Sequence, residues 1–155
     1  KARAVRSADG ILLQKEEDYV FPGEAAIGAV ESVEIIERNT GGAVQQILIH
    51  GEDGTLKIKY EYNIRLMLGL PGGRIHKNDG TDDEGGSLLP SGYFVLEPQE
   101  EDGELSGYRI YGGGLGHGAG MSQNGARIMA EQGGGYEEIL GYFYDGIRLA
   151  RLGET

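Results

Sequence analysis

The stretch GGGLGHGAGMSQNGA at residues 112–126 joins a run typical of a β-strand to a run typical of a helix. Residues 108–111 before it favour a short strand, whereas apolar side chains in residues 122–132 recur at i, i+3 and i+4. Each glycine loses more backbone entropy on folding than alanine would, so such a run is expected only where positive φ or a close approach is needed. The stretch therefore marks the point at which a strand-rich part of the chain gives way to helices.

Two helices are predicted after the strand-rich part, over residues 121–132 and 136–144. Ser122 is placed to cap the first helix, because its hydroxyl can accept a hydrogen bond from a free backbone N–H of the first turn. The glycines at residues 133–135 are expected to end that helix. Residues 147–152 are then predicted to return as an edge strand.

Before residue 112 the chain is predicted to form an antiparallel sheet with one buried face. Strands are expected over residues 10–14, 33–38, 43–50, 56–62, 93–97 and 108–111. Residues 63–69 favour one helical turn, and residues 71–90, rich in Gly, Asp and Asn, favour an exposed, flexible loop. We therefore expect an α+β fold in which a mostly antiparallel sheet is followed by two C-terminal helices. Residues 1–155 form either a single domain or the C-terminal portion of a larger one.

The chain is acidic and contains no cysteine. Its 25 Asp and Glu residues against 14 Lys and Arg give a formal net charge of −11, and the basic residues are scattered. Nucleic acid and anionic membrane surfaces are therefore unfavourable partners, because binding to phosphates depends on clustered cations. The lack of cysteine excludes disulfides, thiolate metal sites and a cysteine nucleophile. No window approaches the roughly 18 to 20 consecutive apolar residues that a membrane-spanning helix requires.

The composition of the glycine-rich stretch is compatible with two interpretations. In one, it is a tight buried crossover whose polar groups are satisfied internally. In the other, the glycines keep a groove open in which His117, Ser122 and Gln123 offer donors and acceptors to a ligand with hydroxyl and amide groups. A dinucleotide-binding loop is disfavoured, because a second helix follows the first where a parallel strand is required. A serine nucleophile is disfavoured because the second glycine of its motif stands at Gly125, one position too late.

The three histidines, His50, His76 and His117, form no metal-binding pattern. No pair has the i, i+3 or i, i+4 spacing that places two ligands on one helix face, so neither a metal nor another cofactor is expected. Residues 79–90 begin like a calcium loop, but Glu84 stands where that loop needs glycine. His117 is either a structural histidine whose ring bonds a backbone carbonyl or a site residue oriented by such a bond.

Residues 114–126 resemble the signature of the SpoIID/LytB domain family, to which stage II sporulation protein D belongs. Residues 129–133 and 136–146 resemble the closing helices of that family. Three further segments are similar to a hairpin, an arginine-containing turn and a serine-phenylalanine strand of the family, at residues 32–51, 63–69 and 89–94 respectively. The resemblance covers residues 31–152 and corresponds to the C-terminal part of the family's domain.

The resemblance implies a bacterial cell-envelope protein that acts on the glycan strands of peptidoglycan. Proteins like stage II sporulation protein D resemble lytic transglycosylases of strands stripped of stem peptides, and the LytB group modifies amidase activity. The family's general acid/base glutamate lies upstream of the part that resembles this chain, so no catalytic residue is expected in it and the natural protein is expected to extend before Lys1. Glu24 is the candidate for a replacement. Glycosidic cleavage needs a carboxylic acid of raised pKa, which other hydrogen-bond donors cannot replace.

Three functional hypotheses follow. The first is the glycan-binding and processing portion of a SpoIID-like lytic transglycosylase; the alternative is a non-catalytic peptidoglycan-binding or amidase-modifying module of the LytB kind; and the third is an unrelated all-β binding module. The resemblance and the glycine-rich stretch together point to substrate-binding roles for His117, Ser122, Gln123, Gly116 and Gly118. The expected partners are peptidoglycan glycan strands and other cell-wall hydrolases or amidases. The expected location is extracytoplasmic, in the cell envelope, by secretion or by a segment outside this chain.

Overall fold

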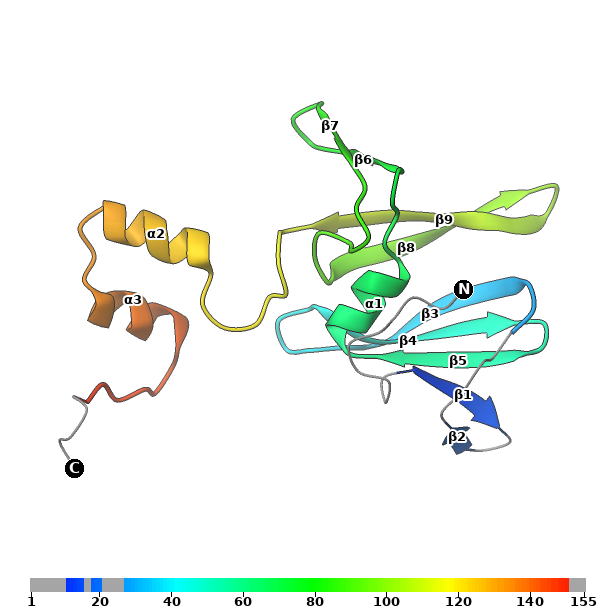
Figure 1. Cartoon of the computed structure of the whole chain (residues 1–155), viewed down its shortest axis with the longest axis horizontal. Helices are drawn as coiled ribbons and strands as arrows, with labels where there is room; N and C mark the ends of the chain where they lie inside the picture. The colour runs from blue at the N-terminus through cyan, green and yellow to red at the C-terminus, as the bar shows by residue number, and fades with distance from the viewer. Residues whose placement is uncertain (1–10, 16–17, 21–26, 151–155) are drawn as a thin grey trace. The chain divides into compact units, whose positions relative to one another are not determined.

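The structure is a computed structural model that describes residues 11–15, 18–20 and 27–150. It divides the chain into two units, Lys1–His117 and Gly118–Thr155, which are described separately below (Figure 1). The first unit contains antiparallel sheets and one helix, and the second contains two helices. The predicted α+β class, with mostly antiparallel strands followed by two C-terminal helices, is therefore confirmed.

A five-stranded antiparallel sheet forms the largest element of unit 1. Its strands are β1 (Ile11–Lys15), β2 (Asp18–Val20), β3 (Val30–Arg38), β4 (Val44–Gly51) and β5 (Gly54–Lys59), in the order β2-β1-β5-β4-β3. The turn between β3 and β4 is stabilised by Asn39, whose side-chain oxygen accepts a hydrogen bond from the Ala43 amide at 2.9 Å. Gly42 in this turn has φ 91°. The turn-forming residues thus join neighbouring strands as hairpins, as the sequence predicts.

The core of unit 1 lies between this sheet and the segments that pack against it. Its fully or nearly buried side chains are Val44, Ile47, Ile49, Ile58, Ile64 and Phe94. Helix α1 (Glu61–Met67) contributes Ile64, which is completely buried, and strand β8 (Tyr93–Glu101) contributes Phe94. The alternating isoleucines of β4 therefore mark the buried face of the sheet, as period-2 patterning predicts.

Strand β5 ends at Lys59, earlier than the alternation over residues 56–62 predicts. Tyr60 has φ 72° and directs the chain out of the sheet into α1, whose first hydrogen bond runs from the Ile64 amide to the Tyr60 carbonyl at 3.1 Å. The side chain of Asn63 closes the same turn by donating to the Lys59 carbonyl. The predicted strand was therefore too long, because alternation alone does not reveal a change of backbone conformation.

A long two-stranded hairpin, β8 (Tyr93–Glu101) and β9 (Glu104–Gly113), completes the framework of unit 1 (Figure 1). Asp102 and Gly103 form its turn with φ 55° and 86°, the signs that two-residue hairpin turns of type I′ require. The Tyr108 hydroxyl, on β9, accepts a hydrogen bond from the Val33 amide of β3 at 2.7 Å. The hairpin is thus tied to the edge of the main sheet.

A short hairpin lies within residues 71–90, where the sequence predicts an exposed loop. It consists of β6 (Arg74–His76) and β7 (Asp82–Glu84), and most of its side chains are exposed. Both strands are only three residues long, so neither produces a recognisable apolar period.

Unit 2 contains α2 (Gln123–Glu131) and α3 (Tyr136–Phe143). The Ser122 hydroxyl accepts a hydrogen bond from the Gly125 amide at 3.1 Å, which confirms the predicted N-cap. Gly133, with φ 95°, ends α2, and the Gly134 amide bonds the Met129 carbonyl as in a Schellman motif. Residues 147–150 form no strand, so that prediction was wrong for them.

Several predictions concern residues outside the described ranges. Glu24, Gly10 and the last two residues of the predicted 147–152 strand fall there. None of the helices in the described part of the chain is long and apolar enough to cross a membrane.

Candidate functional site

The end of β9 leads into a bend at residues 113–117, called here the 113–117 bend. Gly114 and Gly116 have φ 81° and 109°, values that favour glycine. The Gly116 amide donates to the Pro90 carbonyl at 2.9 Å, and Ser91 forms an isolated parallel bridge with Gly116. The Ser91 hydroxyl also donates to the Gly113 carbonyl. The bend is therefore held by the chain segment that precedes β8.

The buried side chain of Arg65 holds that segment in turn. Arg65 on α1 is 7% exposed, and its Nε donates to the Leu89 carbonyl at 2.7 Å while Nη2 donates to the Pro90 carbonyl at 3.0 Å. Nη1 forms an ion pair with the Glu61 carboxylate at 2.6 Å. The Pro90 carbonyl thus accepts hydrogen bonds from both Arg65 and Gly116, which links α1 to the 113–117 bend.

The 113–117 bend lies at the surface of unit 1. Leu115 and His117 are exposed, and Gly116 is half-buried. A Cβ added at Gly116 would meet no atom within 4 Å, so the space beside this residue is open. Gly112, before the bend, has a packing role, because a Cβ there would lie 2.7 Å from the Tyr93 carbonyl oxygen. In unit 1 the bend is thus exposed, while its Gly113 carbonyl and Gly116 amide are bonded within the chain.

The C-terminal part of the glycine-rich stretch begins unit 2. Ser122 caps α2 and Gln123 is the first residue of that helix, with both side chains exposed. Gly125 allows α3 to approach, because its added Cβ would lie 3.0 Å from the Phe143 ring. The Met121 amide donates to the Tyr144 hydroxyl at 3.2 Å. Local packing between the two helices thus orients the start of α2.

The predicted site residues fall into two groups. Gly116 and His117 end unit 1, whereas Gly118, Ser122 and Gln123 belong to unit 2. Within each group the residues are close in the chain, and the structure describes each group only within its own unit. A common groove therefore remains a proposal. Sequence reasoning did not identify Arg65 as part of the site, although the arginine-containing turn and the segment before Phe94 had each been noted separately.

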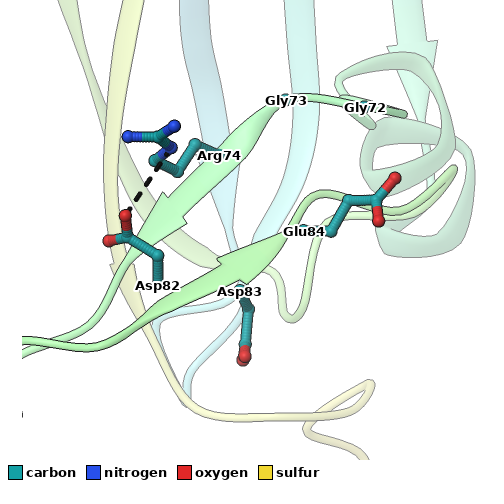
Figure 2. Close-up of a pocket in the computed structure, with 6 residues that line it drawn as sticks. All are labelled: Gly72, Gly73, Arg74, Asp82, Asp83 and Glu84. Carbon is teal, nitrogen blue, oxygen red and sulfur yellow. Dashed lines mark ion pairs between the residues drawn. The ribbon is translucent and has the colours of Figure 1, made fainter.

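A shallow hollow of about 410 Å³ lies beside the β6–β7 hairpin (Figure 2). Asp82 in it pairs with Arg74 at 3.6 Å and with His76 at 2.6 Å. In the same hairpin the Thr81 hydroxyl donates to Asp79 at 2.6 Å and lowers the pKa of that carboxyl. Among the described residues, no three His, Cys, Asp or Glu side chains form a group that could hold a metal ion. The hollow is open, and Arg74, its one cationic side chain, is paired with Asp82, so we do not assign a site there.

The position of the carboxylates bears on glycosidic chemistry. Across residues 27–150, Glu61 is the one carboxylate whose residue is not exposed to solvent. Its side chain is 12% exposed and is occupied by the ion pair with Arg65. A general acid for glycoside cleavage is a carboxyl whose surroundings keep it protonated, usually an apolar pocket. The described carboxylates therefore offer no residue in such surroundings.

The fold and the bend define an α+β protein whose glycine-rich bend is held at the surface of an antiparallel unit. The chain belongs to a family described as a domain of unknown function, DUF8618, whose family model matches residues 10–120. The matched region ends close to the boundary between the two units.

The chain is also similar to a protein named amidase enhancer from Bacillus subtilis (strain 168). It is 50% identical to this chain over 65 residues, which is 42% of this chain and 8% of the relative. The chain thus spans a small fraction of the length of that protein. The name agrees with the amidase-modifying branch of the family resemblance found in the sequence. No solved structure matches the chain.

Proposed function

We propose that this chain is a peptidoglycan-associated module that modifies the activity of a cell-wall amidase, outside the cytoplasm. The observation that carries this proposal is the 50% identity over 65 residues with an amidase enhancer. The glycine-rich stretch supports it, because the 113–117 bend brings the exposed side chain of His117 and the open space beside Gly116 to the surface of unit 1. A polymer rich in hydroxyl and amide groups suits such a surface.

The glycan-facing residues in this proposal are His117, Ser122 and Gln123, with Gly116 and Gly118 leaving room for the ligand. Ser122 retains its hydroxyl hydrogen as a donor, since the N-cap uses the oxygen as an acceptor. Gln123 offers an exposed amide at the first position of α2. These groups bind and orient a glycan strand, and none of them cleaves it.

The amidase-modifying role is favoured over the lytic transglycosylase role. Glu61 is committed to Arg65, and the other described carboxylates are exposed, so the described residues supply no carboxylic acid in apolar surroundings. Purified alone, the chain is expected to release neither anhydro-muropeptides nor new reducing ends from denuded glycan strands. Turnover well above that of a heat-treated sample would restore the transglycosylase hypothesis, with Glu24 as the first residue to replace.

The direct test is an amidase assay. Purified cell-wall amidases of Bacillus subtilis are incubated with purified cell walls, with and without the chain, and the free amino groups released from stem peptides are measured. We expect the chain to raise the rate of at least one amidase while showing no release by itself. An unchanged rate for every amidase, over a range of chain concentrations, would contradict the proposed function.

A further inference from the structure

The β8–β9 hairpin has an outer face that points away from the core of unit 1. Directly opposed residues of an antiparallel pair lie on the same face, and successive pairs alternate between the two faces. The inner face packs on the core through Phe94, Leu96 and Ile110. The outer face is formed by the pairs Tyr93–Gly113, Val95–Tyr111 and Glu97–Arg109.

Apolar and aromatic side chains are exposed at the centre of this outer face. Val95 and Tyr111, which lie opposite each other, are 54% and 49% exposed. The Tyr111 hydroxyl donates to Glu97 at 3.1 Å and accepts from Arg109 at 3.4 Å. The tyrosine ring is therefore held in place before any partner arrives. Tyrosine and arginine are the residue types that most often dominate protein–protein binding energy, and a side chain already ordered loses less entropy on binding.

The charge of the hairpin indicates what kind of partner this face accepts. Arg109 is the only Lys or Arg in residues 93–113, whereas the hairpin carries several carboxylates. The residues of the turn and the adjacent strand ends, called here the acidic tip, are Glu100, Glu101, Asp102 and Glu104. All of them are exposed. Such a surface attracts a cationic protein and repels glycan strands whose stem peptides have been removed, because those strands carry free carboxylates.

We propose that the outer face and the acidic tip of the β8–β9 hairpin form the docking surface for an amidase with a basic surface. This inference rests on the proposed function and identifies the part of the chain that contacts the enzyme. Tyr93 pairs with Gly113 at the base of the hairpin, and Glu101 pairs with Glu104 at its tip. With about 3.4 Å per residue, the tip lies about 27 Å along β8 from the base. The amidase therefore docks on the hairpin at a distance from the 113–117 bend, which lies at its base.

The expected complex is weak and sensitive to salt. Few apolar side chains contribute to it, and exposed charges are screened over about 8 Å at physiological ionic strength. The charges act mainly by raising the rate of association, and salt screens them. The affinity should therefore fall by about tenfold between 50 and 300 mM salt.

Two double variants and one matched control test the surface. Val95→Ser with Tyr111→Ser removes the apolar centre of the outer face. Glu100→Gln with Glu101→Gln removes two charges from the acidic tip. The control, Glu31→Gln with Glu84→Gln, removes two exposed carboxylates elsewhere in unit 1. The circular dichroism spectrum and melting temperature of each variant are compared with those of the unaltered chain. If the serine variant unfolds, the tip variant alone tests the docking surface, because its substituted side chains are exposed and their replacement should leave the fold intact.

The probe is the amidase that the unaltered chain stimulates, measured by binding and by the release of amino groups from cell walls. We expect the serine variant to bind about tenfold more weakly or worse. The tip variant should bind several-fold more weakly at 50 mM salt and equally well at 500 mM salt, while the control stays unchanged. Binding to denuded glycan strands should be equal for all four proteins.

The outcomes separate this inference from the proposed function. If the unaltered chain stimulates an amidase and the hairpin variants do so equally well, the docking surface is wrong and the function stands. The assignment of the docking surface is also wrong if the control variant weakens amidase binding as much as the tip variant does. The same holds if the hairpin variants lose glycan binding but still bind the amidase. If no amidase is stimulated by the unaltered chain, the proposed function fails and this inference fails with it.

Discussion

Replacement of Arg65 by lysine tests the hydrogen-bond network that supports the 113–117 bend. The arginine donates to two backbone carbonyls, those of Leu89 and Pro90, and pairs with Glu61, all within a buried environment. Lysine keeps the positive charge, but its single ammonium group cannot reproduce the planar arrangement of donors. At least one buried carbonyl then loses its charged donor.

The size of the effect follows from these contacts. A hydrogen bond to a charged group contributes about 1.5 to 3 kcal/mol, so Arg65→Lys should lower the free energy of unfolding by about 2 kcal/mol. Arg65→Ala should cost about 3 to 5 kcal/mol, because it also leaves the Glu61 carboxylate without its cation in a site that is only 12% exposed. For a unit of this size, a loss of about 2 kcal/mol lowers the melting temperature by roughly 8 °C.

The matched control is Arg127→Lys. Arg127 also pairs with a glutamate four residues away, Glu131 at 2.5 Å, but both side chains are about three-fifths exposed. Exposed pairs contribute little, so this change should stay within about 0.5 kcal/mol. Urea unfolding followed by circular dichroism measures both variants, and amide exchange at Gly116 should accelerate in Arg65→Lys alone. Equal stability of the two lysine variants, with normal protection of Gly116, would refute the network.

Three other predictions concern single side chains. Tyr60→Gly should be about 1 kcal/mol more stable than Tyr60→Ala in urea unfolding, because only glycine adopts φ 72° without strain, and equal midpoints would contradict this. Ser122→Ala should destabilise α2 by about 1 kcal/mol through loss of its N-cap, seen as earlier loss of helical circular dichroism; an unchanged melting curve would count against the cap. Gln123→Ala and His117→Ala should weaken binding to denuded glycan strands by up to about tenfold, with the melting temperature nearly unchanged for Gln123→Ala. Normal binding combined with earlier melting would show that these two residues have a structural role.

Elements with strong local signals were predicted correctly from the sequence. The hairpin of β3 and β4 follows from the turn at Asn39, and the two C-terminal helices follow from their apolar spacing and from the serine at position 122. Predictions failed where a single backbone conformation decided the outcome. Tyr60 continues the alternation of β5 but has a positive φ, so the strand ends and α1 begins. Residues 147–150 have strand-like composition but form no strand.

The sequence by itself determined the fold class and singled out the glycine-rich stretch, because caps, turns and apolar periods act between residues a few positions apart. Only the tertiary structure decided how the stretch is supported. Arg65 reaches the carbonyls of residues 24 and 25 positions further along the chain, and one of these also accepts the Gly116 amide. Such a contact depends on how α1 and the hairpin pack on one core, and packing of distant segments leaves no periodic signal in the sequence.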